Sequence, residues 1–414
     1  MTGPLWGALP DGWLAGQVKN AATVTLGKML QSKDSGSDVL APYMRAANVQ
    51  PDGVLALDDV NEMWFGDAEL EQLSIQAGDV VVVEGGQGGF GRAAYVKEDL
   101  LGWGFQNSIN RLRPTGDFDG RFIAFYLIAL RASGFIRAYS NVVSMPHLTA
   151  EKLARMPMPM PPLEEQRAVA EYLDRETARI DTLIEEQQRL IGMLRERRAD
   201  LISHAVLDVT SERIQLRRLV DVIDCAHVTA DFVDDDRRFP VASIRECQGA
   251  TVDLSACNYT TAEFFEHLRA AGRAPRAGDL LFIRNVSVGL VSVVTHDLPD
   301  FAIGQETVLL RRKSDVHPFY LRYALVGAEA RHAIEGAMIG STFRRINVSA
   351  IRSLPVPAPP LDEQHRIVAY LDQQTAKIDL LIDETERFIE LARERRSALI
   401  TAAVTGQLDI REMV

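Results

Sequence analysis

Two polar stretches of the chain carry apolar residues at steps of three, four and seven. In the first stretch they are Ile180, Ile184, Ile191, Leu194 and Leu201, and in the second they are Ile378, Ile382, Ile389 and Leu399. Such steps place the apolar side chains on one stripe of a helix, as in a coiled-coil seam. The pattern therefore predicts two long helices that most simply pair with each other in antiparallel fashion.

The two predicted helices are copies of one motif. Each follows a run of prolines, Pro157 to Pro162 or Pro355 to Pro360, which cannot lie inside a helix and which predicts an extended connector. The first helix then begins at Leu163 and the second at Leu361, an offset of 198 residues (361 − 163). The same offset relates the pairs Gln166 and Gln364, and Tyr172 and Tyr370. A repeat this long indicates a duplicated half-protein, and hence a pseudo-twofold internal repeat.

Arg198 and Arg396 are equivalent positions on or beside the predicted seam. A cation buried there is costly without a partner. We therefore expect a carboxylate, or another subunit, beside each of them. A simpler interpretation of the helices stays open at this point, namely a structural hairpin whose charges only face solvent.

The helical stretches alternate with two blocks of mixed pattern. A Gly-Asp pair precedes a β-rich run in each block, at Val80–Val83 and at Leu280–Ile283, and we expect Arg113 and Arg312 to be counterparts near a later strand. This order predicts an α/β (α+β) fold in which two domains of mixed β-sheet and helices are separated by the antiparallel helix pair. The predicted boundaries are 1–155 for the first domain, 156–210 for its proline stop and helix, 211–353 for the second domain, and 354–414 for the second proline stop and helix.

Composition limits the classes of protein that fit. The chain of 414 residues has room for two domains, and no run approaches a membrane span or resembles a leader, so we expect a cytoplasmic protein. The net charge of −12 argues at face value against nucleic acid. A DNA-binding surface would therefore be local, with basic partner subunits supplying part of the attraction to phosphate.

The cysteines predict no special chemistry. Cys225, Cys247 and Cys257 are an odd number and all lie in the second half, which favours reduced thiols. A zinc site that includes His227 is the alternative, but no Cys-x-x-Cys pair supports it. We expect no metal in this chain.

A glycine-rich loop at residues 86–91 fits the dinucleotide-binding pattern and follows an apolar strand. A dinucleotide turn must open a helix, yet the residues after Arg92 have the pattern of a returning strand, and the matching stretch 285–289 lacks the glycines. Two interpretations are favoured instead, a flexible hairpin loop or a loop that contacts DNA. The candidate DNA contacts, chosen because Arg can pair with guanine and Gln or Asn with adenine, are Gln87 and Arg92 in one half and Arg284, Asn285 and Ser287 in the other.

A second candidate surface just precedes the second proline stop. Residues 340–347 hold Thr342, Arg344 and Arg345, whose hydroxyl and guanidinium groups can bind phosphate. Ser144 lies in the corresponding stretch of the first half, which is less basic. An ordinary surface loop is the alternative. The histidines are scattered, and neither a P-loop nor an Asn/Asp-Pro-Pro-Tyr motif is present, so we expect no catalytic residue in this chain.

Together, the variable β-rich block, the proline stop, the Leu-[Asp/Glu]-Glu-Gln motif and the long helix, all repeated once, resemble the specificity (S) subunit of type I restriction-modification enzymes. The resemblance covers essentially the whole chain. It implies two target-recognition domains that each read one half of an interrupted DNA sequence, while the paired helices set the gap between them. It also implies a non-catalytic subunit of a methyltransferase and endonuclease complex.

The resemblance further implies partners. Two modification (methyltransferase) subunits would dock on the helices, and restriction subunits, which are ATP-dependent translocase-nucleases, would join them on double-stranded DNA. S-adenosylmethionine would be bound by the modification subunits, with no cofactor in this chain. The helix positions expected to bind partners or act as the spacer are Leu163, Gln166, Tyr172, Arg198, Leu361, Gln364, Tyr370 and Arg396. The alternative function is a duplicated protein-binding scaffold without a role on nucleic acid.

Overall fold

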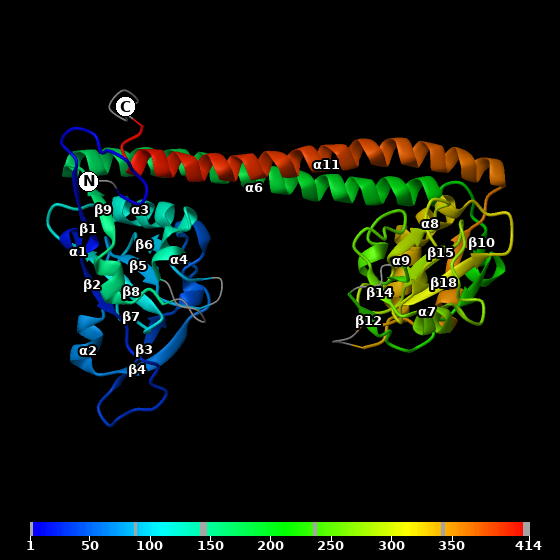
Figure 1. Cartoon of the computed structure of the whole chain (residues 1–414), viewed down its shortest axis with the longest axis horizontal. Coiled ribbons are helices and arrows are strands. Elements are labelled where there is room, and N and C mark those ends of the chain that lie inside the picture. Colours follow the sequence, from blue (N-terminus) through cyan, green and yellow to red (C-terminus); the bar gives the residue numbers. More distant parts are fainter. Residues whose placement is uncertain (1–2, 87–88, 141–146, 235–237, 341–343, 409–414) are drawn as a thin grey trace. The chain divides into compact units, whose positions relative to one another are not determined.

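The computed structural model describes residues 3–86, 89–140, 147–234, 238–340 and 344–408. The chain divides into two compact units. Unit 1 combines Met1–Gln187 with Arg387–Val414, and unit 2 comprises Gln188–Glu386. Each unit therefore contains one globular part together with a segment of each long helix (Figure 1).

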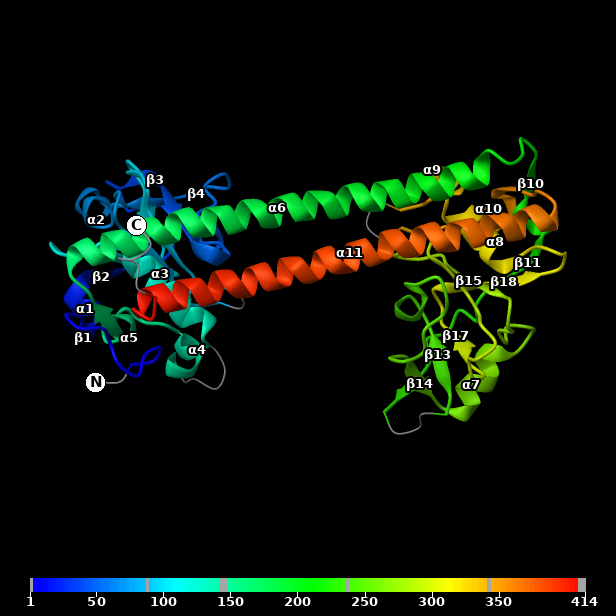
Figure 2. The same cartoon turned by 90° about the horizontal axis from the view of Figure 1, so that it is seen from above.

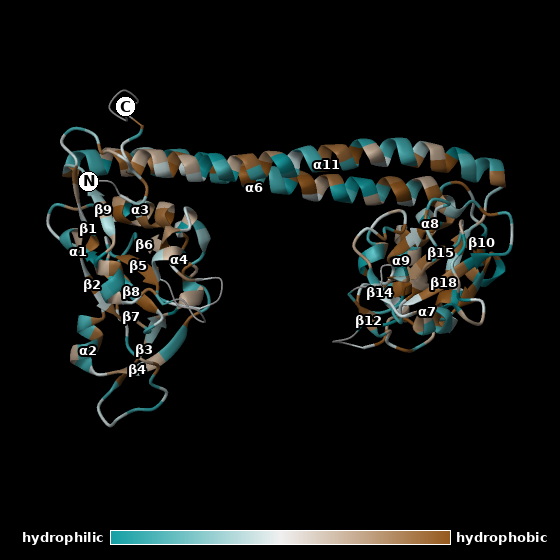
Figure 3. Ribbon diagram, viewed as in Figure 1, coloured by the Kyte–Doolittle hydropathy of each residue, from teal (hydrophilic) through white to brown (hydrophobic). Residues whose placement is uncertain are grey.

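The two long helices are α6, Leu163–Leu207, and α11, Leu361–Val404. Both begin directly after the proline runs, with two acidic residues in the first turn, where the helix dipole favours negative charge. In unit 1 Asp181 of α6 pairs with Arg396 of α11, and in unit 2 Arg198 pairs with Asp379, so the helices run antiparallel. The central seam isoleucines, Ile184, Ile191, Ile378, Ile382 and Ile389, are buried. The predicted antiparallel helix pair is confirmed, and Figure 3 shows polar and apolar residues alternating along the ribbons of the two helices.

The described part of unit 1 contains two larger sheets and one two-stranded sheet. The first has the strand order β2-β8-β5-β6 and is antiparallel throughout, with β2 at Ala22–Leu26, β8 at Ile109–Pro114, β5 at Val80–Val83 and β6 at Ala93–Tyr95. The second has the order β4-β3-β7, with β4 at Asn61–Phe65, β3 at Val39–Met44 and β7 at Gly104–Phe105. The proline run forms β9, Pro157–Met160, which pairs antiparallel with β1, Leu14–Gln17. The predicted extended connector is thus a strand.

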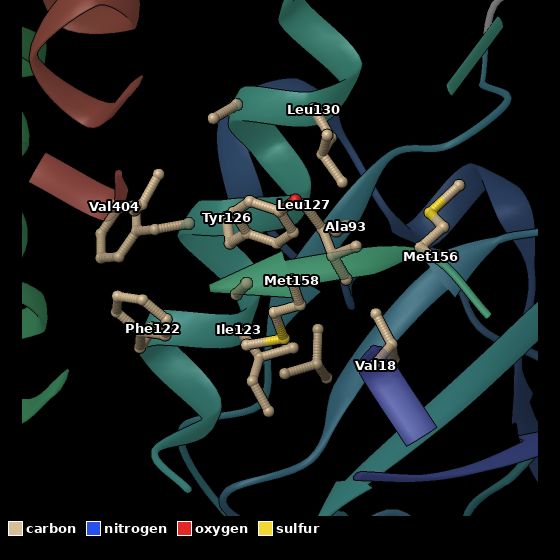
Figure 4. Close-up of a cluster of buried hydrophobic side chains, with 14 of the residues drawn as sticks. Val18, Ala93, Phe122, Ile123, Tyr126, Leu127, Leu130, Met156, Met158 and Val404 are labelled. Carbon is tan, nitrogen blue, oxygen red and sulfur yellow. The ribbon is translucent and has the colours of Figure 1, made fainter. Parts of the chain in front are cut away.

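The main core of unit 1 lies between the four-stranded sheet and the long helices. Helix α3, Gly120–Ala132, packs on that sheet and is joined by Val169 and Leu173 of α6 and by Ile400 and Val404 of α11. Figure 2 shows α3 between the start of α6 and the end of α11, and Figure 4 shows Val404 beside the aromatic side chains of α3. The shorter helices of the unit are α1 at Val18–Ala21, α2 at Asp67–Gln72, α4 at Phe135–Ser140 and α5 at Ala150–Ala154. Because apolar burial dominates folding free energy, this core holds the globular part against both helices.

Unit 2 repeats the same plan. Its sheets have the orders β11-β18-β15-β16 and β12-β14-β13-β17, and β10 pairs with the second proline strand β19. The strands are β10 at Arg213–Gln215, β11 at Val220–Ile223, β12 at Phe232–Val233, β13 at Pro240–Ala242, β14 at Asn258–Thr260, β15 at Leu280–Ile283, β16 at Val291–Val293, β17 at Ala302–Ile303, β18 at Thr307–Arg312 and β19 at Pro355–Pro357. The helices are α7 at Ala262–Arg269, α8 at Pro318–Val326, α9 at Ala328–Ala337 and α10 at Val348–Ser353. The mixed α/β fold and the internal repeat are both confirmed.

One predicted correspondence between the units is wrong by a single residue. Val80 pairs with Leu112 in unit 1, and Leu280 pairs with Leu310 in unit 2, so the counterpart of Arg113 is Arg311 and not Arg312. Arg113 and Arg311 both bind the aspartate of the Gly-Asp pair, Asp79 or Asp279. Arg311 and Arg312 are adjacent, so the sequence alone did not show which of them corresponds to Arg113. The alternation of a strand indicates which residues share a face, but it does not fix the pairing of residues between strands.

Candidate nucleic-acid interface

In unit 1 the two candidate segments of the first half lie side by side. Gly85, at the end of the β5 strand, forms an antiparallel bridge with His147, and the Leu148 N–H donates to the Glu84 carbonyl at 2.8 Å. Burial raises the pKa of the Glu84 carboxyl, and the charge of His147 acts in the opposite direction. The hairpin loop and the segment that leads to the proline stop therefore form one continuous surface. Of the candidate residues here, Gln87 and Ser144 lie outside the described residues.

Unit 2 brings its two segments together in the same way. Asn285 forms an antiparallel bridge with Arg345, and the Ile346 N–H donates to the Arg284 carbonyl at 3.0 Å. A further bond joins the Val286 N–H to the Arg344 carbonyl at 3.0 Å. The sequence predicted the hairpin loop and the basic segment as separate candidates, whereas the fold makes them one loop surface in each unit.

The loop surface of unit 2 is the more basic of the two. Arg344 and Arg345 are exposed, and neither side chain has an ion pair or hydrogen bond among the described residues. Asn285 and Ser287 are partly exposed beside them, and Thr342 lies outside the described residues. Arg344 also lines a cavity of about 410 Å³ between this loop and helices α8 and α9. Free guanidinium groups on an exposed loop are suited to binding phosphate.

Arg284 is less available than its sequence position suggested. Its side chain is mostly buried and donates to Asp224 at 2.6 Å. Burial raises the pKa of Asp224, but the hydrogen bond and charge of Arg284, together with the charge of His227 and the Cys225 N–H, lower the pKa overall. A contact between Arg284 and a base would therefore have to compete with this ion pair.

Asp224 also belongs to a small polar cluster with Cys225 and His227. The two imidazole nitrogens face different partners, since Nδ1 lies 3.6 Å from the Cys225 sulfur and Nε2 lies 3.0 Å from the Asp224 carboxylate. The Cys225 thiol donates to the Gln305 carbonyl at 3.1 Å, and burial raises its pKa, which favours the protonated thiol. Burial likewise raises the pKa of the Cys247 thiol to about 12. The ligand atoms of Asp224, Cys225 and His227 lie within 4.8 Å of one another.

The glycine-rich segment is a β-hairpin loop. Residues 93–95 form β6, which pairs antiparallel with β5, so no helix follows the glycines and the dinucleotide interpretation fails. Gly91 has a φ of +70°, and a Cβ atom at this position would lie only 2.9 Å from the Ile136 side chain. Both the backbone conformation and the lack of space therefore favour glycine here. Arg92 is partly buried, and its side chain donates to the Val49 carbonyl at 3.4 Å. The Arg92 side chain thus forms a hydrogen bond within the globular part.

The helix motif has a role that the sequence reasoning missed. Gln166 is buried, and its side chain accepts from the Asp119 N–H at 2.9 Å and donates to the Pro161 carbonyl at 2.8 Å. Gln364 accepts from the His317 N–H at 2.8 Å and donates to the Pro359 carbonyl at 2.8 Å. Asp119 and His317 cap helices α3 and α8. Each glutamine therefore ties the start of a long helix to the first helix of a globular core.

The seam arginines meet carboxylates, as the sequence predicted. Arg198 binds Asp379 at 2.7 Å, and Arg396 binds Asp181 at 2.9 Å. The remaining helix candidates lie nearer the surface. Tyr172 and Leu163 are partly buried, whereas Tyr370 is 48 % and Leu361 is 38 % exposed. The last two side chains are thus accessible to a partner.

Comparison with known proteins identifies the family. The model for the type I restriction modification DNA specificity domain matches residues 19–191 and 259–388, more than half of the chain. The chain belongs to this family. The match falls in two stretches, one in each half of the repeat, and it confirms the predicted class, a DNA-recognition subunit and not a stand-alone enzyme. A scaffold without a role on nucleic acid is not favoured.

Similar proteins carry the same description. The chain is 22 % identical to the type I restriction enzyme EcoKI specificity subunit of Escherichia coli (strain K12), over 97 % of this chain and 90 % of that protein. It is 22 % identical to the putative type I restriction enzyme specificity subunit S.HindORF215P of Haemophilus influenzae, over 70 % of this chain and 74 % of that protein. A solved structure from a study of complex assembly in the type I R-M system is similar in fold, with a TM-score of 0.76, 18 % identity, and coverage of 97 % of this chain and 100 % of the other. None of the described helices is long and apolar enough to cross a membrane.

Proposed function

We propose that this chain reads a two-part, interrupted DNA target and positions two modification subunits on it. The observation that carries the proposal is the exact repeat of one plan in a chain of the DNA specificity family. Each unit has a four-stranded sheet of the same order, β2-β8-β5-β6 or β11-β18-β15-β16, together with an equivalent glutamine joint and an equivalent paired loop surface. Two similar but unequal surfaces suit a target with two different halves.

The division of labour follows the four blocks of the sequence. Residues 1–155 and 211–353 are the target-recognition regions, and residues 156–210 and 354–414 hold the connectors and the spacer helices. A helix segment of 35 residues extends about 50 Å, which exceeds one turn of DNA at about 34 Å. Helices of this length can set the gap between two half-sites.

The loop surfaces are the proposed DNA contacts. Arg344, Arg345 and Thr342 would bind phosphate, with Ser144 at the corresponding place in the first region. Asn285 and Ser287, and Gln87 in the first region, would face base edges. Arg92 and Arg284 are proposed contacts as well, although each would first leave its internal partner, the Val49 carbonyl or Asp224.

The proposed docking sites for modification subunits are two equivalent sets of exposed apolar side chains on the long helices, which we call the docking patches. In unit 1 the patch is Leu183, Phe388 and Leu391, and in unit 2 it is Leu381, Leu190 and Met193, the same positions at the offset of 198 residues. All six side chains are between 36 % and 59 % exposed, although they lie on the coiled-coil helices. Exposed apolar groups repeated in this way mark protein interfaces, and two copies suit two identical partners.

The chemistry of the complex would lie in those partners. The modification subunits would bind S-adenosylmethionine and methylate an adenine that leaves the base stack. Restriction subunits, ATP-dependent translocase-nucleases, would join to cleave unmethylated DNA. Because the chain carries a net charge of −12, basic partner surfaces would supply much of the attraction to DNA. The complex would work in the cytoplasm, where chromosomal DNA and the partners meet.

Methylome sequencing with and without the gene tests the proposal. We expect deletion to abolish adenine methylation at one split motif and to leave other methylation unchanged, and complementation with the intact gene to restore it. An unchanged methylome in cells that express the complete system would rule the proposal out.

A further inference from the structure

Arg396 joins three elements of unit 1. Its side chain is 9 % exposed, and the guanidinium binds the Asp181 carboxylate of α6. It also donates to the Asp52 carbonyl at 3.3 Å and to the Asp52 carboxylate at 3.5 Å. Asp52 belongs to the globular part, in a 3-10 turn at Pro51–Gly53. One side chain of α11 thus holds both the other long helix and a turn of the first target-recognition region.

The equivalent residue in unit 2 makes only half of these contacts. Arg198 binds Asp379 across the helix pair, but within the described residues its side chain has no bond to the globular part, and it is 30 % exposed. The turn at the corresponding place, residues 249–251, is tied to its own sheet, where the Val293 N–H donates to the Ala250 carbonyl at 2.9 Å. The contact between turn and helix is therefore particular to unit 1.

The turn in unit 1 is built in a costly conformation. Asp52 has a φ of 63° and a ψ of 22°, the left-handed region that side chains other than glycine rarely occupy. Neighbouring bonds hold the turn, since Arg92 donates to the Val49 carbonyl and the Gln50 N–H donates to the Val54 carbonyl. Strain of this kind persists where the surroundings enforce it, and it often marks a functional position.

The contact between Arg396 and Asp52 lies between two cavities. Two cavities of about 540 Å³ each flank it, and Asp52, Asp181 and Arg396 line both. Packing around the contact is therefore incomplete.

The contact of Arg396 with Asp52 and Asp181 lies farther along α6 than the polar contacts at the start of that helix. Polar contacts nearer the start of α6 also join the globular part to that helix. Gln166 binds Asp119, the Trp13 ring N–H donates to Glu165 at 2.8 Å, and Arg121 pairs with Asp174 at 3.4 Å. Asp181 lies 7 residues (181 − 174) beyond Asp174, which is about 10 Å at 1.5 Å per residue. A globular part attached near the start of the helix can tilt about those contacts, and a further attachment beyond them opposes the tilt.

We propose that Arg396 and Asp52 form a positioning contact that fixes the tilt of the first target-recognition region on the helix pair and thereby restricts the gap between half-sites that the complex accepts. This inference rests on the proposed function. Asp52 and Arg396 are positioning residues and need not touch DNA.

The test compares Arg396→Met with Arg198→Met in the complete complex with its modification subunits. Both variants lose the same ion pair between the helices, and only the first also loses the bond to the turn. Methylation is measured on duplexes with the native gap and on duplexes with the gap one base pair longer or shorter. We expect Arg396→Met to lower the preference for the native gap by about fivefold, and Arg198→Met to keep it.

A second variant covers a failure of Arg396→Met to fold. Asp52→Lys changes a side chain that is 67 % exposed and places it against Arg396, whose pair with Asp181 remains. Asp52→Asn keeps the hydrogen-bond acceptor and is the control. Hydrogen exchange of the backbone around residues 50–54 should speed up in Arg396→Met and Asp52→Lys and stay unchanged in Arg198→Met and Asp52→Asn.

The outcomes separate the inference from the proposed function. If the wild-type complex methylates no split target, the proposed function fails, and exchange at the turn still decides whether the contact holds it. If the wild type is selective and Arg396→Met and Asp52→Lys are equally selective, the inference is wrong. It is also wrong if Arg198→Met relaxes the gap as much as Arg396→Met does.

Discussion

At the scale of single residues, the two glutamines of the helix motif show how one side chain can join two folding elements. Gln166 is 1 % and Gln364 is 4 % exposed, and each satisfies a backbone N–H and a backbone carbonyl that would otherwise be buried without partners. The amide fits because it donates and accepts at once. A glutamate in either place would lose the donor to the proline carbonyl.

Replacing either glutamine with alanine should destabilise its unit. The change leaves buried backbone groups unpaired, at a cost of roughly 1–3 kcal/mol each, so we expect a loss of about 2 kcal/mol in the free energy of unfolding. Urea unfolding followed by circular dichroism measures this loss. Gln188→Ala, at an exposed position of α6, is the control and should change little. A loss for Gln166→Ala no larger than that of the control would contradict the role of the joint.

His317 makes the second joint sensitive to pH. Burial lowers its pKa, and the charges of His365 and Arg312 lower it further, whereas Asp372 opposes them. The folded state therefore binds the proton less well than the unfolded state, and stability falls as pH drops through the unfolded value of about 6.5. His317→Asn keeps a helix-capping side chain and cannot titrate. Thermal unfolding between about pH 7.5 and about pH 5.5 should show a smaller acid loss for this variant than for the wild type. Equal losses would remove His317 as the cause.

At the scale of elements, the sequence predicts the long helices well and the loop surfaces poorly. The starts at Leu163 and Leu361 follow from proline chemistry and helix periodicity, which are local properties. The bridges from Gly85 to His147 and from Asn285 to Arg345 join residues about sixty positions apart, and only the folded sheets bring them together. Likewise, Arg284 follows β15 and its partner Asp224 follows β11, and these two strands are separated by β18 in the sheet, so the ion pair could not be inferred from the loop itself.

The basic loop of unit 2 should contribute to DNA affinity through phosphate and not through sequence. Arg344 and Arg345 are exposed and unpaired among the described residues, so each can replace counterions on the DNA. Replacing both with alanine should weaken binding to all sequences alike and reduce the slope of log K against log salt by about 1 for each arginine.

The measurement is DNA binding by the assembled complex over a series of salt concentrations. Lys313→Ala is the control, because this exposed lysine of the same unit already pairs with Asp221. An unchanged slope in the double variant would show that the loop does not lie on the DNA backbone. A loss confined to one base position would indicate base reading instead.

At the scale of the molecule, the repeat conserves the contacts that hold the fold together, whereas the residues of the two loop surfaces differ. The glutamine joints, the seam ion pairs and the order of the main four-stranded sheet recur. By contrast, Glu84 of one loop surface corresponds to Arg284 of the other, and His147 corresponds to Arg345. Because the helices and the core contacts repeat, they can present equivalent docking sites to two identical partner subunits. Because the loop surfaces differ, they can bind two different DNA half-sites.

This contrast predicts the composition of complexes that lack one docking patch. Replacing Leu183, Phe388 and Leu391 with serine removes the apolar patch of unit 1 and leaves that of unit 2 intact, so the complex should bind one modification subunit where the wild type binds two. Native mass spectrometry measures the ratio directly. The matched triple variant, at Leu381, Leu190 and Met193, should give the same ratio, because the two patches are equivalent by the repeat. Two bound subunits in both variants would place the docking sites elsewhere, and a complete loss of binding in either variant would mean that the partners bind only as a pair.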